Sequence, residues 1–241
     1  MGETGKCSEQ HKHKMCPNFR QQTRHRLPEG NICLFHRECR LHVPFAEDLL
    51  EAFLVHVVDA SHDWTAVLNA QYTYMMNVQA AGTGVFPDWS DGSGNAINPP
   101  NNSATSTYWT FNKESVRIPW RIAWDYYWFA DPRAASVLNT LNNFIMVRSN
   151  NDPTQIPAVN YSWNLNIGAD ITGQSLPVQW LGAWCATGMA GNSMDWLDVC
   201  TNVLNATEMQ TSASSYFPNI LQMIYSQLLN GMYVKPANMG I

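Results

Sequence analysis

Apolar residues recur every three or four positions in several separate stretches of this 241-residue chain, a spacing typical of amphipathic helices. Val and Ile show little of the every-second-position alternation that indicates β-strands. The sequence therefore predicts an all-α architecture of about seven helices arranged in hairpins. The expected helices cover residues 46–58, 62–80, 119–129, 132–147, 176–189, 194–205 and 215–230.

Local signals mark several of the helix ends. Pro119 stands where the first turn of a helix tolerates proline, and Asp131 followed by Pro132 is typical of an N-cap and first helical residue. Gly231 fits a glycine at the C-terminal end of the last helix. Residues 81–107 are rich in Gly, Pro, Asn and Ser and predict a long loop, which in a compact domain is commonly functional.

Composition narrows the classes of protein to consider. Hydrophobic residues make up 45% of the chain and charged residues 14%, which excludes a disordered protein. The net charge of -5 argues against a nucleic-acid partner, because neutralising phosphates needs an excess of Lys and Arg. No apolar run reaches the roughly 18 to 20 residues that span a bilayer, so we expect a globular protein without a membrane partner.

Charge and residue types change sharply near residue 45. Residues 1–45 hold eight of the 14 Lys and Arg, five of the seven His and four of the six Cys, and they carry a net charge of +4 against -9 for the remainder. We therefore expect a basic, Cys- and His-rich appendage without an assigned fold at 1–45 and one domain at 46–241. The first residues are not followed by the apolar stretch of a signal peptide.

The appendage raises the question of a metal site. Its Cys and His fall in two clusters that lack the C-x-x-C pairs of compact zinc fingers, so we expect incidental residues, no metal and no cofactor. A metal-dependent regulator is the last of the functional hypotheses. The clusters consist of Cys7, His11, His13 and Cys16, and of Cys33, His36 and Cys39.

The densest chemistry lies between residues 108 and 134. At about 100° per residue, two arginines, a carboxylate and two indoles share one quarter to one third of a helix surface. They form either a satisfied internal network or the lining of a wet cleft. Glu114 lies three residues before the first arginine, which could hold its carboxylate in place and ionised. The shared face consists of Arg117, Arg121, Trp124, Asp125 and Trp128.

This stretch resembles glycoside hydrolase family 8, which includes inverting endoglucanases, chitosanases and xylan-cleaving enzymes. The family pattern is close to Tyr-Asp-Ala-x-Arg-x-Pro-x-Arg-Ile-Ala-x-Asp-Tyr-x-Trp-x-Gly-Asp-x-Arg-Ala, and residues 86–89 and 216–231 resemble its Pro-Asp-Trp loop and its final helix. The resemblance covers about residues 46 to 236. The matching positions are Arg117, Pro119, Arg121, Ile122, Ala123, Asp125, Tyr126, Trp128, Asp131, Arg133 and Ala134.

The resemblance implies an (α/α)6-type barrel, present here in part, with a cleft for a β-1,4-linked polysaccharide of the cellulose or β-glucan type. It implies inverting hydrolysis with Glu114 in the place of the family's catalytic base. Trp89, Arg117 and Tyr216 are then expected to bind the substrate, and Arg121 and Asp125 to orient other residues. The resemblance also implies secretion and a polysaccharide as the partner.

Two departures keep a second hypothesis open. Lys113 and Glu114 stand where the family has Tyr and Asp, and the family's acid-bearing motif, like Ser-Glu-Gly-x-Gly-Tyr-Gly, does not occur in the sequence. The alternative is a catalytically impaired member that at most binds polysaccharide. Helix faces that would meet absent hairpins also predict self-association.

Several residues have plain packing interpretations. Trp120, Trp124 and Tyr127 follow helical spacing and are expected to pack in the core or between helices. Cys185 and Cys200, 15 positions apart on neighbouring expected helices, are interpreted as buried small hydrophobic residues.

Overall fold

The computed structural model describes residues 61, 63–98, 107–173, 176–191 and 194–235. This part of the chain is helical and contains no strand beyond three isolated bridges, so the predicted all-α class is confirmed. Six of the expected helices are present with ends shifted by a few residues. They are α2 (Trp64–Ala81), α3 (Ile118–Phe129), α4 (Pro132–Arg148), α5 (Val178–Thr187), α6 (Met194–Ala206) and α7 (Tyr216–Leu229).

Two expectations fall outside the described residues. These are the Cys- and His-rich appendage at 1–45 and the helix at 46–58. Among the described helices, none is long and apolar enough to cross a membrane.

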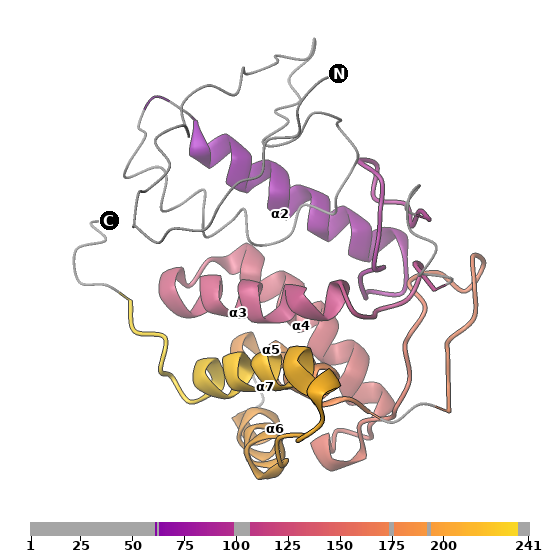
Figure 1. Cartoon of the computed structure of the whole chain (residues 1–241). Helices are drawn as coiled ribbons and strands as arrows, with labels where there is room; N and C mark the ends of the chain where they lie inside the picture. Colours follow the sequence, from indigo (N-terminus) through magenta and orange to yellow (C-terminus); the bar gives the residue numbers. More distant parts are fainter. Residues whose placement is uncertain (1–60, 62, 99–106, 174–175, 192–193, 236–241) are drawn as a thin grey trace, which may run out of the picture. The chain divides into compact units, whose positions relative to one another are not determined.

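Helix α5 lies at the centre of the packing. It contacts α3 and α4 as well as α6 and α7 (Figure 1). Helices α3 and α4 also contact each other. Every residue of α5 is buried, and its sequence VQWLGAWCAT carries no charge. A helix that is apolar on all sides has to be covered on all sides, which explains why four neighbours surround it.

The contact between α5 and α7 depends on a glycine. A Cβ atom added to Gly182 of α5 would lie 2.4 Å from the ring of Tyr225 on α7. Atoms that are not bonded do not approach so closely, so only glycine lets the tyrosine ring lie directly on the backbone of α5. The close approach brings the Tyr225 hydroxyl across α5 toward the start of α3.

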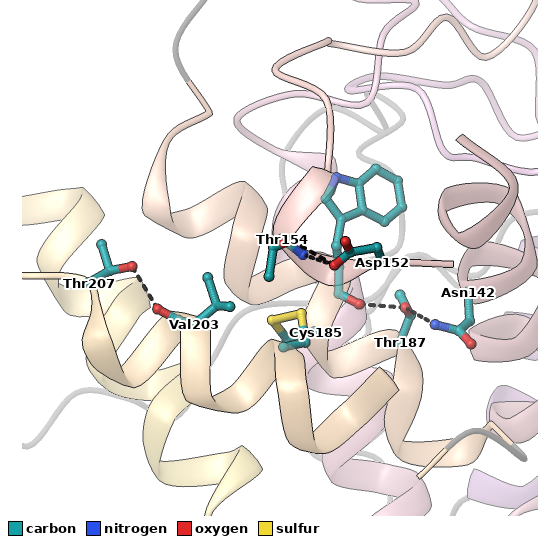
Figure 2. Close-up of a disulfide and its surroundings, with 9 residues drawn as sticks. Asn142, Asp152, Thr154, Cys185, Thr187, Val203 and Thr207 are labelled. Carbon is teal, nitrogen blue, oxygen red and sulfur yellow. Dashed lines mark hydrogen bonds between the residues drawn. A yellow bond between two sulfur atoms is a disulfide. The ribbon is translucent and has the colours of Figure 1, made fainter. Parts of the chain in front are cut away.

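Cys185 and Cys200 form a disulfide that links α5 to α6, a bond that their interpretation as buried small hydrophobic residues did not predict (Figure 2). Both are fully buried, as expected. Packing of α6 against α5 places the Cα atoms of the two cysteines 5.2 Å apart, within the range that a disulfide bridges. Beside the bond, Asn142 of α4 donates a hydrogen bond of 3.1 Å to the hydroxyl of Thr187, which ties α4 to the end of α5.

Candidate active site

Glu114 lies in the turn that precedes α3, directly before the short 3-10 helix η1 (Ser115–Arg117). Nη2 of Arg117 donates a hydrogen bond to its carboxylate, which confirms the predicted pairing. The side chains of Glu114 and Arg117 are 31% and 25% exposed. The carboxylate is therefore accessible to a water molecule or a ligand while its partner holds it.

Asp88 holds this turn in place through hydrogen bonds from the main chain. It follows α2 by seven residues and is 1% exposed. Its Oδ1 accepts hydrogen bonds from the main-chain N–H groups of Asn112, Glu114 and Ser115 at 3.0 to 3.1 Å, and from the Ser115 hydroxyl at 3.0 Å. In the sequence, Asp88 is part of the Pro-Asp-Trp loop, and no signal there predicts a function for it.

Burial governs the ionisation of Asp88. Loss of solvent raises the pKa of its carboxyl to about 7, although the hydrogen bonds from Ser115 and Asn112 and the nearby charge of Arg117 act to lower the pKa. Its second oxygen, Oδ2, is buried and has no hydrogen-bond partner within the described part of the chain. Oδ1 thus accepts all four of the hydrogen bonds to the Asp88 carboxyl.

Three further contacts fix the turn. The Tyr225 hydroxyl of α7 donates to the main-chain oxygen of Val116. Trp180 of α5 donates its indole N–H to the oxygen of Phe111 at 3.3 Å, and the N–H of Phe111 donates to the oxygen of Tyr161 at 2.8 Å. Segments from four parts of the sequence therefore converge on residues 111–116, which makes the backbone that carries Glu114 rigid.

Arg121 lies one turn further along α3 and is buried. Nη1 donates a 3.4 Å hydrogen bond to the oxygen of Arg117, and its guanidinium carbon lies 4.6 Å from the centre of the Trp120 ring. Burial lowers the pKa of Arg121 to about 10, which leaves it charged at neutral pH. Arg121 thus adds a second positive charge next to Arg117 and close to the Tyr225 side chain.

Asp125, also on α3, contacts α2 instead of the Glu114 turn. It accepts a hydrogen bond from the Tyr72 hydroxyl of α2, and Arg133 of α4 lies 4.6 Å from the centre of the Tyr72 ring. Burial raises the pKa of Asp125 to about 6. The polar face predicted on this helix is therefore divided, because Arg117 and Arg121 serve the Glu114 turn whereas Asp125 joins α3 to α2.

The aromatic residues of α3 pack mainly on one another. Trp120 and Trp124 stack with their ring centres 5.9 Å apart, and both are partly buried. Trp128 donates its indole N–H to the oxygen of Tyr233 at 2.7 Å. The packing expected of Trp120 and Trp124 is confirmed, whereas Tyr127 is 45% exposed and the expectation for it is wrong.

The two aromatic residues expected to bind substrate differ in setting. Trp89 follows Asp88 directly and is partly buried, and its main-chain N–H donates to the oxygen of Tyr108 at 3.3 Å. Tyr216 begins α7 and is 74% exposed. Within the described residues no hydrogen bond joins Tyr216 to Glu114, and its role stays a prediction.

The described residues also contain no group of three or more His, Cys, Asp or Glu side chains arranged to hold a metal ion.

The chain is similar to known proteins in part of its sequence and in its fold. No family model matches the chain. A beta-glucanase of Niallia circulans is 31% identical over 114 residues, which cover 44% of this chain and 27% of that protein. Among solved structures, the fold is similar to the apo form of a β-1,3-1,4-glucanase from Paenibacillus sp. X4, with a TM-score of 0.65, 21% identity and coverage of 80% of this chain and 50% of that one.

Two xylose-binding structures show the same likeness at lower identity. Rex8A of Paenibacillus barcinonensis, complexed with xylose, has a TM-score of 0.57 with 18% identity over 71% of this chain and 43% of that one. A xylobiose complex of a family 8 glycoside hydrolase from Teredinibacter turnerae has a TM-score of 0.56 with 16% identity over 71% and 41%. The described helices share their fold with these structures, one of which is a family 8 glycoside hydrolase. The chain spans half or less of the length of these family 8 structures, so its helices correspond to one portion of the (α/α)6 architecture.

Proposed function

We propose that the protein is a glycoside hydrolase that acts on a β-1,4-linked polysaccharide of the glucan type, with Glu114 as the general base. The observation that carries the proposal is an accessible carboxylate on a turn that buried hydrogen bonds fix from four directions. The likeness to a beta-glucanase and to xylose-binding family 8 structures supports a sugar polymer as the substrate class.

The mechanism that we propose is inversion, as the resemblance to glycoside hydrolase family 8 implies. The Glu114 carboxylate takes a proton from a water molecule, whose oxygen attacks the anomeric carbon while the bond to the leaving oxygen breaks. Arg117 holds the carboxylate in place before the step through their ion pair. A second carboxylic acid, roughly 6.5 to 9.5 Å from the first in inverting enzymes, gives its proton to the leaving oxygen. The sequence does not contain the acid-bearing motif of the family.

The remaining roles follow from position. Trp89 lies beside the supporting Asp88, where an indole can stack on a sugar ring, and the open setting of Tyr216 suits a contact with a chain-like substrate. Arg117 can donate a further hydrogen bond to a sugar hydroxyl. Arg121 and Asp125, both buried, orient α3 and do not touch substrate.

A second candidate is a catalytically impaired protein that binds polysaccharide without cleaving it. It is favoured by the absence of the acid-bearing motif from the sequence, because leaving-group protonation typically contributes about 10² to 10⁴-fold to the rate. The same turn and aromatic side chains would then serve binding alone.

Reducing-sugar release from soluble cellulose, xylan and chitosan separates the two candidates. The proposal expects turnover by the full chain on at least one polymer and its loss in Glu114→Gln, which keeps the size of the side chain and removes its charge. Turnover that survives the substitution contradicts Glu114 as the base. No turnover together with retardation in gels that contain the polymers favours the binding protein.

We also propose that the protein is secreted and that it self-associates. The Cys185–Cys200 disulfide supports a protein that matures in an oxidising compartment. Exposed apolar side chains on α7, Phe217 and Met223, support self-association of the chain. Sedimentation velocity of the wild type and of a Phe217→Ser/Met223→Ser variant tests the second, with a smaller average mass expected for the variant.

A further inference from the structure

The helical segment that begins at Glu114 lacks a local cap. The residues at a helix start leave main-chain N–H groups without partners inside the helix, and a side chain of the N-cap residue usually accepts one of them. Glu114 occupies the N-cap position of η1, but its side chain makes no capping bond. Instead, the N–H groups of Glu114 and Ser115 donate to Asp88, which stands 26 and 27 residues earlier.

We propose that Asp88 is the positioning residue for Glu114, a cap supplied from a distant loop that leaves the Glu114 carboxylate free to face the substrate. The inference deepens the proposed function and rests on Glu114 as the base. Asp88 does not touch the reacting atoms in this assignment, because it is buried beneath the turn.

The physical reason is competition for the same donors. A carboxylate near a helix start is attracted by the unpaired N–H groups and by the positive end of the helix dipole. Without Asp88, the Glu114 carboxylate, whose own N–H is one of these donors, would be drawn inward to cap them, and this turn would withdraw it from Arg117 and from solvent. With Asp88 present, one buried oxygen accepts hydrogen bonds from three N–H groups and a hydroxyl. These donors therefore do not draw the Glu114 carboxylate inward.

The arrangement of the two Asp88 oxygens sharpens the expectation for a conservative change. Oδ1 carries all four hydrogen bonds, whereas Oδ2 has no partner in the described part of the chain. An asparagine side chain keeps an acceptor oxygen in the place of Oδ1 and puts its amide group in the place of Oδ2. Asp88→Asn should therefore preserve most of the cap, and Asp88→Ala should abolish it.

A matched control exists elsewhere in the chain. Asp152 is the N-cap residue of the 3-10 helix η2 (Pro153–Gln155), and its Oδ1 likewise accepts from a main-chain N–H, that of Thr154 at 2.9 Å, and from a hydroxyl, that of Thr154 at 2.7 Å (Figure 2). Asp152→Ala removes a capping carboxylate that does not contact the Glu114 turn. It measures what the loss of any such cap does to the protein.

The first experiment needs no substrate. Amide hydrogen exchange of the full chain is followed at residues 112, 114 and 115 in the wild type, Asp88→Ala, Asp88→Asn and Asp152→Ala. We expect exchange at the turn to accelerate by about 3- to 30-fold in Asp88→Ala and by less than about 3-fold in Asp88→Asn and Asp152→Ala. Asp88→Ser, which refills part of the buried space, is measured in the same way should the alanine variant not fold. Unchanged exchange in Asp88→Ala or Asp88→Ser overturns the proposal.

The second experiment uses the hydrolysis assay. We expect kcat to fall by about 10- to 100-fold in Asp88→Ala with KM within about 3-fold of the wild type, because a misplaced base slows the chemical step more than binding. Asp88→Asn should recover most of kcat, and Asp152→Ala should leave it unchanged. A loss in Asp88→Asn as large as in Asp88→Ala, or an equal loss in Asp152→Ala, overturns positioning through Oδ1. Absence of turnover in the wild type contradicts the proposed hydrolysis and leaves the exchange result to decide on the cap.

Discussion

The hydroxyl of Tyr225, on the last described helix, donates a hydrogen bond to the main-chain oxygen of Val116, two residues after the candidate base Glu114. Tyr225 is fully buried, and its ring lies on Gly182 of α5. Burial raises the pKa of Tyr225, so the hydroxyl keeps its proton and remains a donor. Helix α7 thus contacts the turn that carries the Glu114 carboxylate, and α5 supports the tyrosine that makes the contact.

Tyr225→Phe removes this bond and leaves the oxygen of Val116 buried without that donor. We expect the free energy of unfolding to fall by about 1 to 2 kcal/mol in urea titrations. Tyr127→Phe serves as the control, because its hydroxyl also donates to a main-chain oxygen, that of Gly231 at 3.3 Å, but on the exposed surface. The same loss in both variants would show that the buried bond has no special weight.

Removal of the Cys185–Cys200 disulfide should also lower stability. The bond closes a loop with a sequence separation of 15, for which the loss of chain entropy in the unfolded state corresponds to about 3 kcal/mol. Urea midpoints of the wild type with and without a reductant, and of Cys185→Ala/Cys200→Ala, test the expectation. The midpoint of the double variant should not respond to the reductant, and a wild-type midpoint equally insensitive to reductant would contradict the structural bond.

Asp125 gives a pH dependence with a definite sign. Burial raises the pKa of its carboxyl to about 6, and the negative charge of Asp131 also raises it. The hydrogen bond from Tyr72 and the positive charge of Arg133 act in the opposite direction. A group that binds its proton more tightly in the folded state stabilises the fold at low pH, so this contribution is complete below about pH 4 and is lost as the pH rises through about 6.

Asp125→Asn keeps an acceptor for the Tyr72 hydroxyl and removes the ionisation. We expect the variant to be more stable than the wild type at pH 8, by about 1 to 3 kcal/mol, and the difference to shrink toward pH 4. Asp198→Asn, on the exposed face of α6, is the control. Parallel stability curves for wild type and Asp125→Asn between pH 4 and pH 8 would contradict the raised pKa.

Gly182→Ala tests the close contact between α5 and α7. The added methyl group would overlap the Tyr225 ring, and relieving the overlap should cost about 1 to 3 kcal/mol of unfolding free energy. Gly191→Ala is the matched change, because its Cβ would meet no atom nearer than 3.2 Å and its backbone suits alanine. Thermal unfolding of both variants should place Gly182→Ala well below Gly191→Ala.

Much of the helical layout could be predicted from the sequence because apolar spacing and end signals are local. Asp131 caps α4 and Pro132 begins it, as the dipeptide indicates. The pairing of Glu114 with Arg117 was equally accessible, since three positions separate them. Each of these features depends on residues close together in the chain.

The support of the turn could not be read in the same way. Asp88 and Tyr225 reach it from 26 residues before and 109 residues after their partners, and neither shows a periodic signal of its own. The disulfide was missed for a related reason, because apolar spacing places two cysteines on neighbouring helices without giving the angle at which the helices pack. Long-range contacts need the tertiary arrangement.

The complete burial of α5 has a consequence for synthesis of the chain. Residues 178–187 leave the ribosome before α6 and α7, which cover two of their sides. Until residue 229 has emerged, the nascent polypeptide presents an uncharged helix to its surroundings, a state in which chains are prone to aggregate. Release of the polypeptide at any earlier codon would therefore yield a product that chaperones or proteases have to remove.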